Sequence, residues 1–287
     1  MKKFKIKSYS KINLTLRVLK KLKNGYHQIN SLITFCTLND EIIISKTNGF
    51  KDNIKFTGKF RKGIKKESNT ITKILYALRS KQILKNQYFK IYIKKNIPHG
   101  SGLGGGSANA ATLLNFLNLK MKLKLNKKNI YKLSKKIGFD TPICLLRKNT
   151  FFLGKKNKII RLNKNFNLNI LIVYPNLICS TKKIYFKNKK FSKYNNLPNF
   201  NNIKKKGLIN FLKEESNDLE EAVIKNYPKI KKIIDYVSLL RGCYFSRITG
   251  SGSAIIGIFR DTNSAIYAKK LIKLKFPKYW SYVSKTI

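Results

Sequence analysis

The chain has 287 residues, of which 43% are apolar and 12% aromatic, enough to build one large core or two ordinary ones. This composition excludes a disordered polycation, although 62 Lys and Arg residues against 12 Asp and Glu residues give a net charge of +50. No apolar stretch approaches the roughly 18 residues of a membrane span, and Lys or Arg recurs throughout residues 1–21, which argues against a signal peptide.

The positive charge allows two interpretations. A basic domain is the electrostatic footprint of a nucleic-acid-binding protein. The lysines, however, are spread evenly from Lys2 to Lys285, and asparagine, which adds no charge, is also abundant. We therefore favour a compositional bias over specific nucleic-acid binding. Such a surface would still bind polyanions weakly and speed the approach of a phosphorylated ligand.

The four cysteines are far apart in the sequence and form no CxxC pair. Metal sites and disulfide frameworks need closer or patterned spacing. We therefore expect reduced, packed thiols and no metal bound by protein ligands alone, in a cytoplasmic protein without membrane attachment.

Strands and helices mix in the first half of the chain. The alternation of apolar residues and the turn residues between them predict strands at residues 4–18, 32–38, 41–45 and 88–95. Helical spacing predicts helices at residues 69–80, 107–120 and 128–138, the first with Ile71, Ile74, Leu75 and Leu78 at helical intervals. Asn39-Asp40 is expected to form a turn between the second and third strands, and Gly138 to end the third helix.

The second half begins after a predicted strand pair near residues 150–162. A buried strand (168–175), a long surface loop (Lys182–Lys206), helices at 217–225 and 229–240, strands at 245–248 and 254–259, a helix at 262–274 and a last strand follow. Without strict alternation of strand and helix, the fold class is predicted as α+β. Two domains are expected, at residues 1–160 and 161–287.

The stretch "PHGSGLGGGSANAA" places five of the sixteen glycines between Gly100 and Gly106, after a strand and before a helix. Glycines let backbone N–H groups approach an anion closely, and the helix adds its own free N–H groups and positive dipole end. A phosphate cradle is predicted. A connection without function is less probable, because five glycines lose much conformational entropy on folding.

Two common nucleotide loops do not fit this stretch. A Walker loop requires Lys after its last glycine, and here Ser107 follows Gly106. The spacing of Gly100, Gly102 and Gly105 matches a dinucleotide loop, but that loop needs an acidic residue about 20 positions later. No acidic residue lies between Glu67 and Asp140.

Five ordered segments carry a more specific resemblance. "PHGSGLGGGSANAA", with "SYSKINLTL" before it and "GFDTPIC", "SNDLEEAV" and "RITGSGSAIIGIF" after it, resembles the motifs of the GHMP kinase superfamily. "KNGYHQINSLITF" is similar to the block of those members that act on a cytidine-linked sugar alcohol. The segments span residues 8 to 259, so the resemblance covers essentially the whole chain.

The resemblance implies a two-domain GHMP kinase fold, with an N-terminal domain like domain 2 of ribosomal protein S5 and a ferredoxin-like C-terminal domain. It implies ATP-dependent phosphorylation of the 2-hydroxyl of a cytidine-linked sugar alcohol phosphate, in the non-mevalonate isoprenoid precursor pathway. ATP and Mg²⁺ would be the cofactors, and the chain would be a monomer or weak homodimer that binds no specific nucleic acid.

By resemblance, the site residues fall into three groups. The catalytic pair is Lys11 and Asp140. The residues matched to ATP binding are Asn69, Lys95, Pro98, His99, Gly100, Ser101, Gly102, Leu103, Gly104, Gly105, Gly106, Ser107 and Ala108. The residues matched to substrate binding are Asn13, Tyr26, His27, Tyr185, Gly250, Ser251 and Gly252.

Several of these residues would look ordinary without the resemblance. Asp140 would be a turn residue before Thr141-Pro142, and Lys11 a solvated strand lysine. The motifs make Asp140 a general base or positioning carboxylate for the substrate hydroxyl. Lys11 could hold Asp140 ionised, polarise the hydroxyl or offset phosphoryl charge. Ser107 could cap the helix or offer its hydroxyl to a phosphate or Mg²⁺, and His99, within the cradle, has no assigned individual role.

The cytidine would be held by aromatic residues. By resemblance, His27 contacts the cytosine edge, and Tyr26 and Tyr185 pack against the base. Three alternatives stay open: another kinase of the superfamily, acting on homoserine or mevalonate; a nucleic-acid-binding protein with a similar fold; and an inactive relative. The intact Lys11 and Asp140 speak against the last of these.

Overall fold

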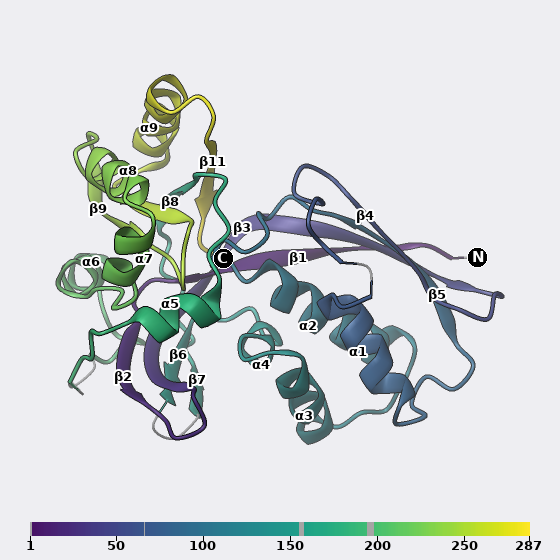
Figure 1. Ribbon diagram of the computed structural model, residues 1–287. Helices are drawn as coiled ribbons and strands as arrows, with labels where there is room; N and C mark the ends of the chain where they lie inside the picture. Colours follow the sequence, from purple (N-terminus) through teal and green to yellow (C-terminus); the bar gives the residue numbers. More distant parts are fainter. Residues whose placement is uncertain (1, 66, 155–157, 194–197) are drawn as a thin grey trace. The chain divides into compact units, whose positions relative to one another are not determined.

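The computed structural model describes residues 2–65, 67–154, 158–193 and 198–287 (Figure 1). It divides by contacts into two compact units that do not follow a single cut in the chain. The first unit comprises residues 1–11, 38–99 and 104–147; the second comprises residues 12–37, 100–103 and 148–287. The domain boundary predicted near residue 160 therefore stays a prediction.

The first unit combines a sheet with helices. Its elements are β1 (Phe4–Asn13, to Lys11), β3 (His27–Thr47, from Leu38), β4 (Asn53–Thr57), α1 (Thr70–Arg79), β5 (Tyr88–Lys94), α2 (Gly105–Lys120), α3 (Lys127–Ile137) and α4 (Thr141–Cys144). The strand order is β4-β5-β3, with β4 parallel and β3 antiparallel to β5. Figure 1 shows α1 and α2 side by side.

The core of the first unit lies between this sheet and the helices. Phe89, Ile91 and Ile93 of β5 are fully buried, and Lys90 and Tyr92 between them are exposed, as the alternating pattern predicted. In α1 the buried residues are the four that the helical spacing selected, Ile71, Ile74, Leu75 and Leu78. One apolar cluster joins both sets to α2 and α3.

The second unit contains two groups of strands. Its elements are β2 (Arg17–Lys21), the first part of β3, β6 (Thr150–Leu153), β7 (Lys158–Arg161), β8 (Asn169–Tyr174), α5 (Thr181–Lys187), α6 (Lys205–Glu214), α7 (Glu220–Asn226), α8 (Lys229–Ser238), β9 (Cys243–Ile248), β10 (Ile255–Phe259), α9 (Thr262–Lys275) and β11 (Trp280–Lys285). The first part of β3 pairs with β2 and β6, and β6 pairs with β7.

The other sheet of this unit has the order β11-β8-β10-β9 and is antiparallel throughout. The helices α8 and α9 pack on it around an apolar cluster that includes Leu171, Val237, Ile255 and Ala268. This order, with helices after its first and third strands, is the ferredoxin-like arrangement that the resemblance implied. Mixed strands and helices confirm the α+β class.

Two sequence predictions are wrong. Asn39-Asp40 forms no turn, because β3 runs unbroken through it and the carboxylate of Asp40 is buried among hydrogen-bond donors. The predicted loop Lys182–Lys206 begins within α5 and ends within α6. Ser180 caps α5, and Ile184 buries its apolar side chain, so a short Lys-rich helix forms. Residues 194–197 of that predicted loop, and 155–157 of the predicted strand pair, lie outside the described residues.

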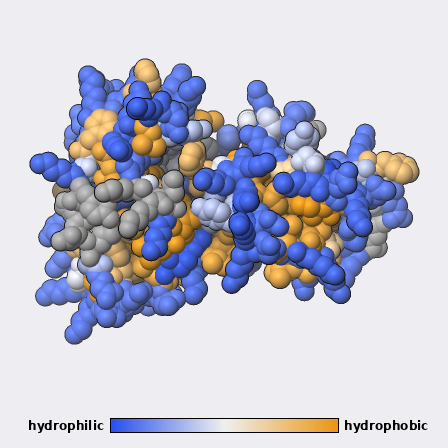
Figure 2. All heavy atoms as spheres, turned by 90° about the horizontal axis from the view of Figure 1, so that it is seen from below, coloured by the Kyte–Doolittle hydropathy of each residue, from blue (hydrophilic) through white to orange (hydrophobic). Residues whose placement is uncertain are grey.

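Hydrophilic side chains cover most of the face seen in Figure 2, with smaller apolar areas between them. This agrees with the even spread of lysines along the sequence. No helix in the described ranges combines the length and apolar character needed to cross a membrane.

Candidate functional site

An ion pair joins the two predicted catalytic residues in the first unit. The Nζ atom of Lys11, in β1, lies 3.0 Å from Oδ2 of Asp140, which precedes α4. The Lys11 side chain is 5% exposed, whereas that of Asp140 is 38% exposed. A buried cation therefore holds a carboxylate that solvent or a ligand can reach.

Local backbone contacts place Asp140 at the start of α4. The carbonyl of Asp140 accepts a hydrogen bond from the N–H of Cys144 at 3.1 Å, and the N–H of Thr141 donates to the carbonyl of Gly138 at 3.1 Å. Pro142 fits the first turn, where no N–H donor is needed. The short helix therefore fixes the backbone from which the carboxylate extends.

Gly104 brings the glycine loop against Lys11. Its φ angle is +67°, and a Cβ atom there would lie 2.5 Å from Cγ of Lys11. Only glycine combines this dihedral angle with so close an approach. The start of α2 is thereby held beside the lysine stem.

The first turn of α2 has the character of an anion site. It contains no acidic residue, and no side chain caps it. The hydroxyl of Thr70, at the start of α1, donates to the carbonyl of Gly106 at 2.7 Å and ties the two helix starts together. Asn69 caps α1, its Oδ1 accepting from the N–H of Ile71 at 2.9 Å. Ser107 is half-buried in the same turn of α2.

The remaining part of the glycine loop belongs to the second unit, where it packs on a second glycine turn, Gly250–Gly252, between β9 and β10. Gly102 has a φ of +82°, and a Cβ atom there would lie 2.1 Å from the carbonyl oxygen of Thr249. The N–H of Ala254 donates to the carbonyl of Ser101 at 3.0 Å. The glycine loop and this turn come from distant segments of the sequence and are in direct contact.

Asn13 and Ser251 are anchored at this contact. The N–H of Asn13 donates to the Oγ1 atom of Thr249 at 2.9 Å, and its Nδ2 donates to Oγ of Ser31 at 2.7 Å. The hydroxyl of Ser251 lies 2.9 Å from that of Thr181. The side chain of Asn13 thus has a fixed orientation.

His27 and Tyr185 form an aromatic pair in the second unit. Their ring centroids are 5.1 Å apart, at an interplanar angle of 37°. Burial, with the positive charge of Lys21, holds the pKa of His27 below its ordinary value of 6.5. The imidazole is therefore neutral at pH 7, with one nitrogen that donates and one that accepts. Tyr26, beside it in the chain, is 54% exposed.

Sequence reasoning assigned no role to Asn217, which holds the second glycine turn. Its Nδ2 donates to the carbonyls of Gly250 at 2.8 Å and Ile248 at 3.2 Å, and its Oδ1 accepts from the N–H of Leu219. The only sequence signal was its place in the "SNDLEEAV" segment. A positioning amide of this kind has no signature in composition or spacing.

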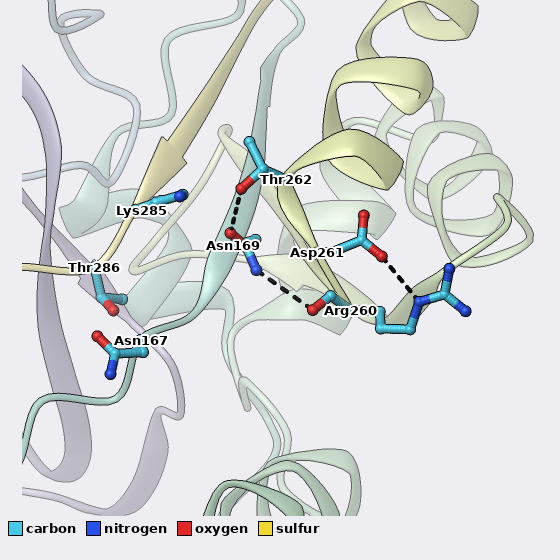
Figure 3. Close-up of a pocket in the computed structure, with 7 residues that line it drawn as sticks. All are labelled: Asn167, Asn169, Arg260, Asp261, Thr262, Lys285 and Thr286. Carbon is cyan, nitrogen blue, oxygen red and sulfur yellow. Dashed lines mark hydrogen bonds and ion pairs between the residues drawn. The ribbon is translucent and has the colours of Figure 1, made fainter.

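An open pocket of about 370 Å³ in the second unit contains none of the predicted site residues (Figure 3). It is lined by Asn167, Asn169, Arg260, Asp261, Thr262, Lys285 and Thr286. Asn169 accepts from the hydroxyl of Thr262 at 2.9 Å, and Arg260 pairs with Asp261 at 2.9 Å. Because these polar groups already pair with one another, this pocket is a weaker candidate than the glycine turns.

The described residues include no group of three or more His, Cys, Asp and Glu side chains that could hold a metal ion.

Comparison with known families gives two matches. Residues 69–148 match the GHMP kinases N terminal domain, and residues 197–271 match the GHMP kinases C terminal domain. The first match contains the glycine loop and Asp140, and the second contains Asn217 and the second glycine turn.

Individual relatives match along the whole chain. The chain is 41% identical over 288 residues to the 4-diphosphocytidyl-2-C-methyl-D-erythritol kinase of Pelagibacter ubique, covering 100% of both chains. It is 34% identical to the enzyme of the same name from Caldanaerobacter subterraneus, covering 99% of this chain and 97% of that one.

Solved structures share the fold. A crystal structure of 4-(cytidine 5'-diphospho)-2C-methyl-D-erythritol kinase superposes with a TM-score of 0.77 at 21% identity, covering 99% of both chains. The homoserine kinase of Cytophaga hutchinsonii gives a TM-score of 0.72 at 16% identity, covering 100% of this chain and 95% of that one.

The close approach of Gly104 to Lys11 generates a prediction. In Gly104→Ala, the new methyl group is expected to displace the lysine stem and lengthen the 3.0 Å ion pair with Asp140. Gly63→Ala is the matched control, because Gly63 has a φ of +81° with no atom within 4 Å of its would-be Cβ. Crystal structures of both variants measure the Nζ–Oδ2 distance. An unchanged distance in Gly104→Ala would contradict the argument.

Proposed function

Because this chain belongs to the GHMP kinase family, we propose that it transfers the γ-phosphate of ATP to the 2-hydroxyl of 4-diphosphocytidyl-2-C-methyl-D-erythritol. The observation that supports this best is 41% identity along the full chain to an enzyme of that name. The buried Lys11, paired with the accessible carboxylate of Asp140 beside a glycine-lined helix start, supplies a site suited to phosphoryl transfer.

In the proposed reaction, Asp140 positions the substrate hydroxyl and accepts its proton as the oxygen attacks the γ-phosphorus, while the bond from that phosphorus to the β,γ-bridging oxygen breaks and ADP leaves. Lys11 holds the Asp140 carboxylate in position through the ion pair and offsets charge on the transferred phosphoryl group. The 3.0 Å pair is compatible with both roles, since the ammonium lies within reach of the carboxylate. Catalysis then consists mostly of positioning and charge neutralisation.

ATP would bind along the glycine loop. The N–H groups at the start of α2, from Gly105 to Ala108, would hold its phosphates, and Gly100–Leu103 would complete the cradle. Lys95 and Asn69 would lie near the adenine. Since the first turn of α2 has no acid, Mg²⁺ would be held by phosphate oxygens, water and the hydroxyl of Ser107, and would neutralise phosphate charge.

The cytidine end would be bound by the aromatic pair of the second unit. A neutral His27 presents both a donor and an acceptor, as the edge of cytosine requires, and the ring of Tyr185 beside it offers a face for the base. Tyr26 would cover the base from its exposed position. Asn13 and the turn Gly250–Gly252 would contact the sugar alcohol and its phosphates.

An acceptor panel tests this function. Wild-type protein with Mg-ATP is expected to phosphorylate the cytidine-linked alcohol, followed by coupled ADP release, and to leave homoserine and mevalonate unreacted. CMP is expected to compete with the acceptor. Turnover of homoserine or mevalonate without competition by CMP would instead assign another activity of the superfamily.

The catalytic pair can be tested separately from binding. Lys11→Ala and Asp140→Asn are each expected to reduce turnover by about 10³-fold or more, since each removes a charge used in the transfer step. ATP affinity, measured by isothermal titration calorimetry, should change much less. Near-normal turnover in both variants would refute these roles.

The state of His27 predicts a pH dependence. Because burial and the charge of Lys21 lower its pKa, the imidazole is neutral at pH 7, and protonation on acidification replaces its acceptor by a second donor. The KM for the cytidine substrate should therefore be constant above pH 7 and rise as the pH falls through the lowered pKa. His27→Asn, which does not titrate, should have a raised KM without this acid-side rise. An identical acid-side rise in this variant would assign the effect to another group.

A further inference from the structure

The carboxylate of Asp40 joins the strand that leads into the glycine loop to the helix that follows it. Asp40 lies in β3 and is 0% exposed. Its Oδ1 accepts from the backbone N–H of Asn96 at 2.8 Å and of Ile97 at 2.9 Å. Its Oδ2 accepts from Nδ2 of Asn109 at 3.0 Å and pairs with Nζ of Lys95. Four donors therefore converge on one buried carboxylate.

These donors come from both ends of the loop. Residues 95–97 follow β5 and precede the glycines, whereas Asn109 lies one turn into α2. All of them belong to the first unit. Asp40 thus fixes the distance between the end of the strand and the start of the helix.

Lys95 is held from several sides. Its N–H donates to the carbonyl of Thr57 at 2.8 Å, and its carbonyl accepts from the N–H of Phe60. Its ammonium reaches the start of α2, where a Cβ on Gly105 would lie 3.4 Å from Nζ. Asp40 therefore determines where this buried cation stands relative to the first turn of α2.

Net stability alone does not account for such an arrangement. The desolvation of two buried charges largely cancels their attraction, and apolar replacements of similar volume are often no less stable. What a buried pair with additional hydrogen bonds supplies is a fixed position for each member. Here the members position the start of the helix that the proposed function assigns to ATP.

We propose that Asp40 is a positioning residue for nucleotide binding, holding Lys95 and the first turn of α2 in the arrangement that receives ATP. This inference rests on the proposed ATP-dependent activity. It assigns to Asp40 no contact with ATP itself.

Asp40→Asn tests the proposal, because it keeps the size of the side chain but leaves the buried ammonium of Lys95 without its anion. The Kd for ATP, measured by isothermal titration calorimetry, is expected to rise about tenfold or more, with a parallel rise in the KM for ATP. The KM for the cytidine acceptor should stay near the wild-type value.

Asp52→Asn is the matched control. Asp52 uses the same chemistry at the other end of β5, where it pairs with Arg79 at 2.8 Å and accepts from the N–H of Phe89 at 2.9 Å. Both variants should unfold at a lower temperature, but only Asp40→Asn should weaken ATP binding. Equal ATP affinities in the two variants would make the role of Asp40 merely structural and overturn the proposal.

Asn109→Leu decides the question if Asp40→Asn does not fold. The substitution keeps the branched shape of the side chain, removes one hydrogen-bond donor to Asp40, and leaves the ion pair and both backbone hydrogen bonds in place. We expect about threefold weaker ATP binding, and an unchanged Kd would overturn the proposal. The ATP titration does not depend on the acceptor. A wild-type protein that binds ATP without phosphorylating the cytidine substrate would therefore refute the proposed function and not this inference.

Discussion

The arrangement of the first unit depends on the burial of one carboxylate among four donors. An unpaired charge inside a protein is strongly unfavourable, so Asp40 is compatible with the core only because Lys95, Asn109 and two backbone N–H groups surround it. The same contacts keep β3 extended through a dipeptide that would otherwise favour a turn. The contacts of Asp40 therefore keep β3 continuous and also fix the positions of the end of β5 and the start of α2.

The elements that could be predicted from the sequence are those whose stability depends on their own pattern of buried residues. Regular burial produces regular patterns, so β5, α1 and the four buried residues of α1 follow from spacing alone. Two of the elements that were not predicted have weaker patterns. In β4 (Asn53–Thr57), exposed residues alternate with residues that are only half-buried, and α5 has a single buried residue, Ile184. Both depend on partners distant in the chain, and their own residues carry little signal. The turn predicted at Asn39-Asp40 was wrong for the same reason, because the hydrogen-bond donors to Asp40 lie more than fifty residues away in the chain.

The candidate site divides in a similar way. Motifs identified Lys11 and Asp140, and the structure pairs them. The residues that motifs did not mark as functional, Asp40 and Asn217, act by hydrogen-bonding backbone groups near the glycines. A glycine-rich loop lets its backbone approach a ligand or a neighbouring segment closely, but the loop is less rigid for the same reason. Such loops need polar side chains from other elements to fix their backbone, and no local sequence pattern identifies those side chains.

The net charge of +50 comes mostly from lysines, and an exposed lysine cannot replace a buried one such as Lys11. Surface lysines act through solvent, and their fields fade over a Debye length of about 8 Å at physiological ionic strength. They can therefore attract anionic substrates, and where one forms an exposed ion pair, as Lys231 does with Asp235, solvent screening makes that pair weak. Lys11 differs because its side chain is 5% exposed and its stem is fixed by Gly104, which leaves its ammonium 3.0 Å from Asp140. Burial and a neighbouring glycine, rather than the number of cations, determine the position of this ammonium group.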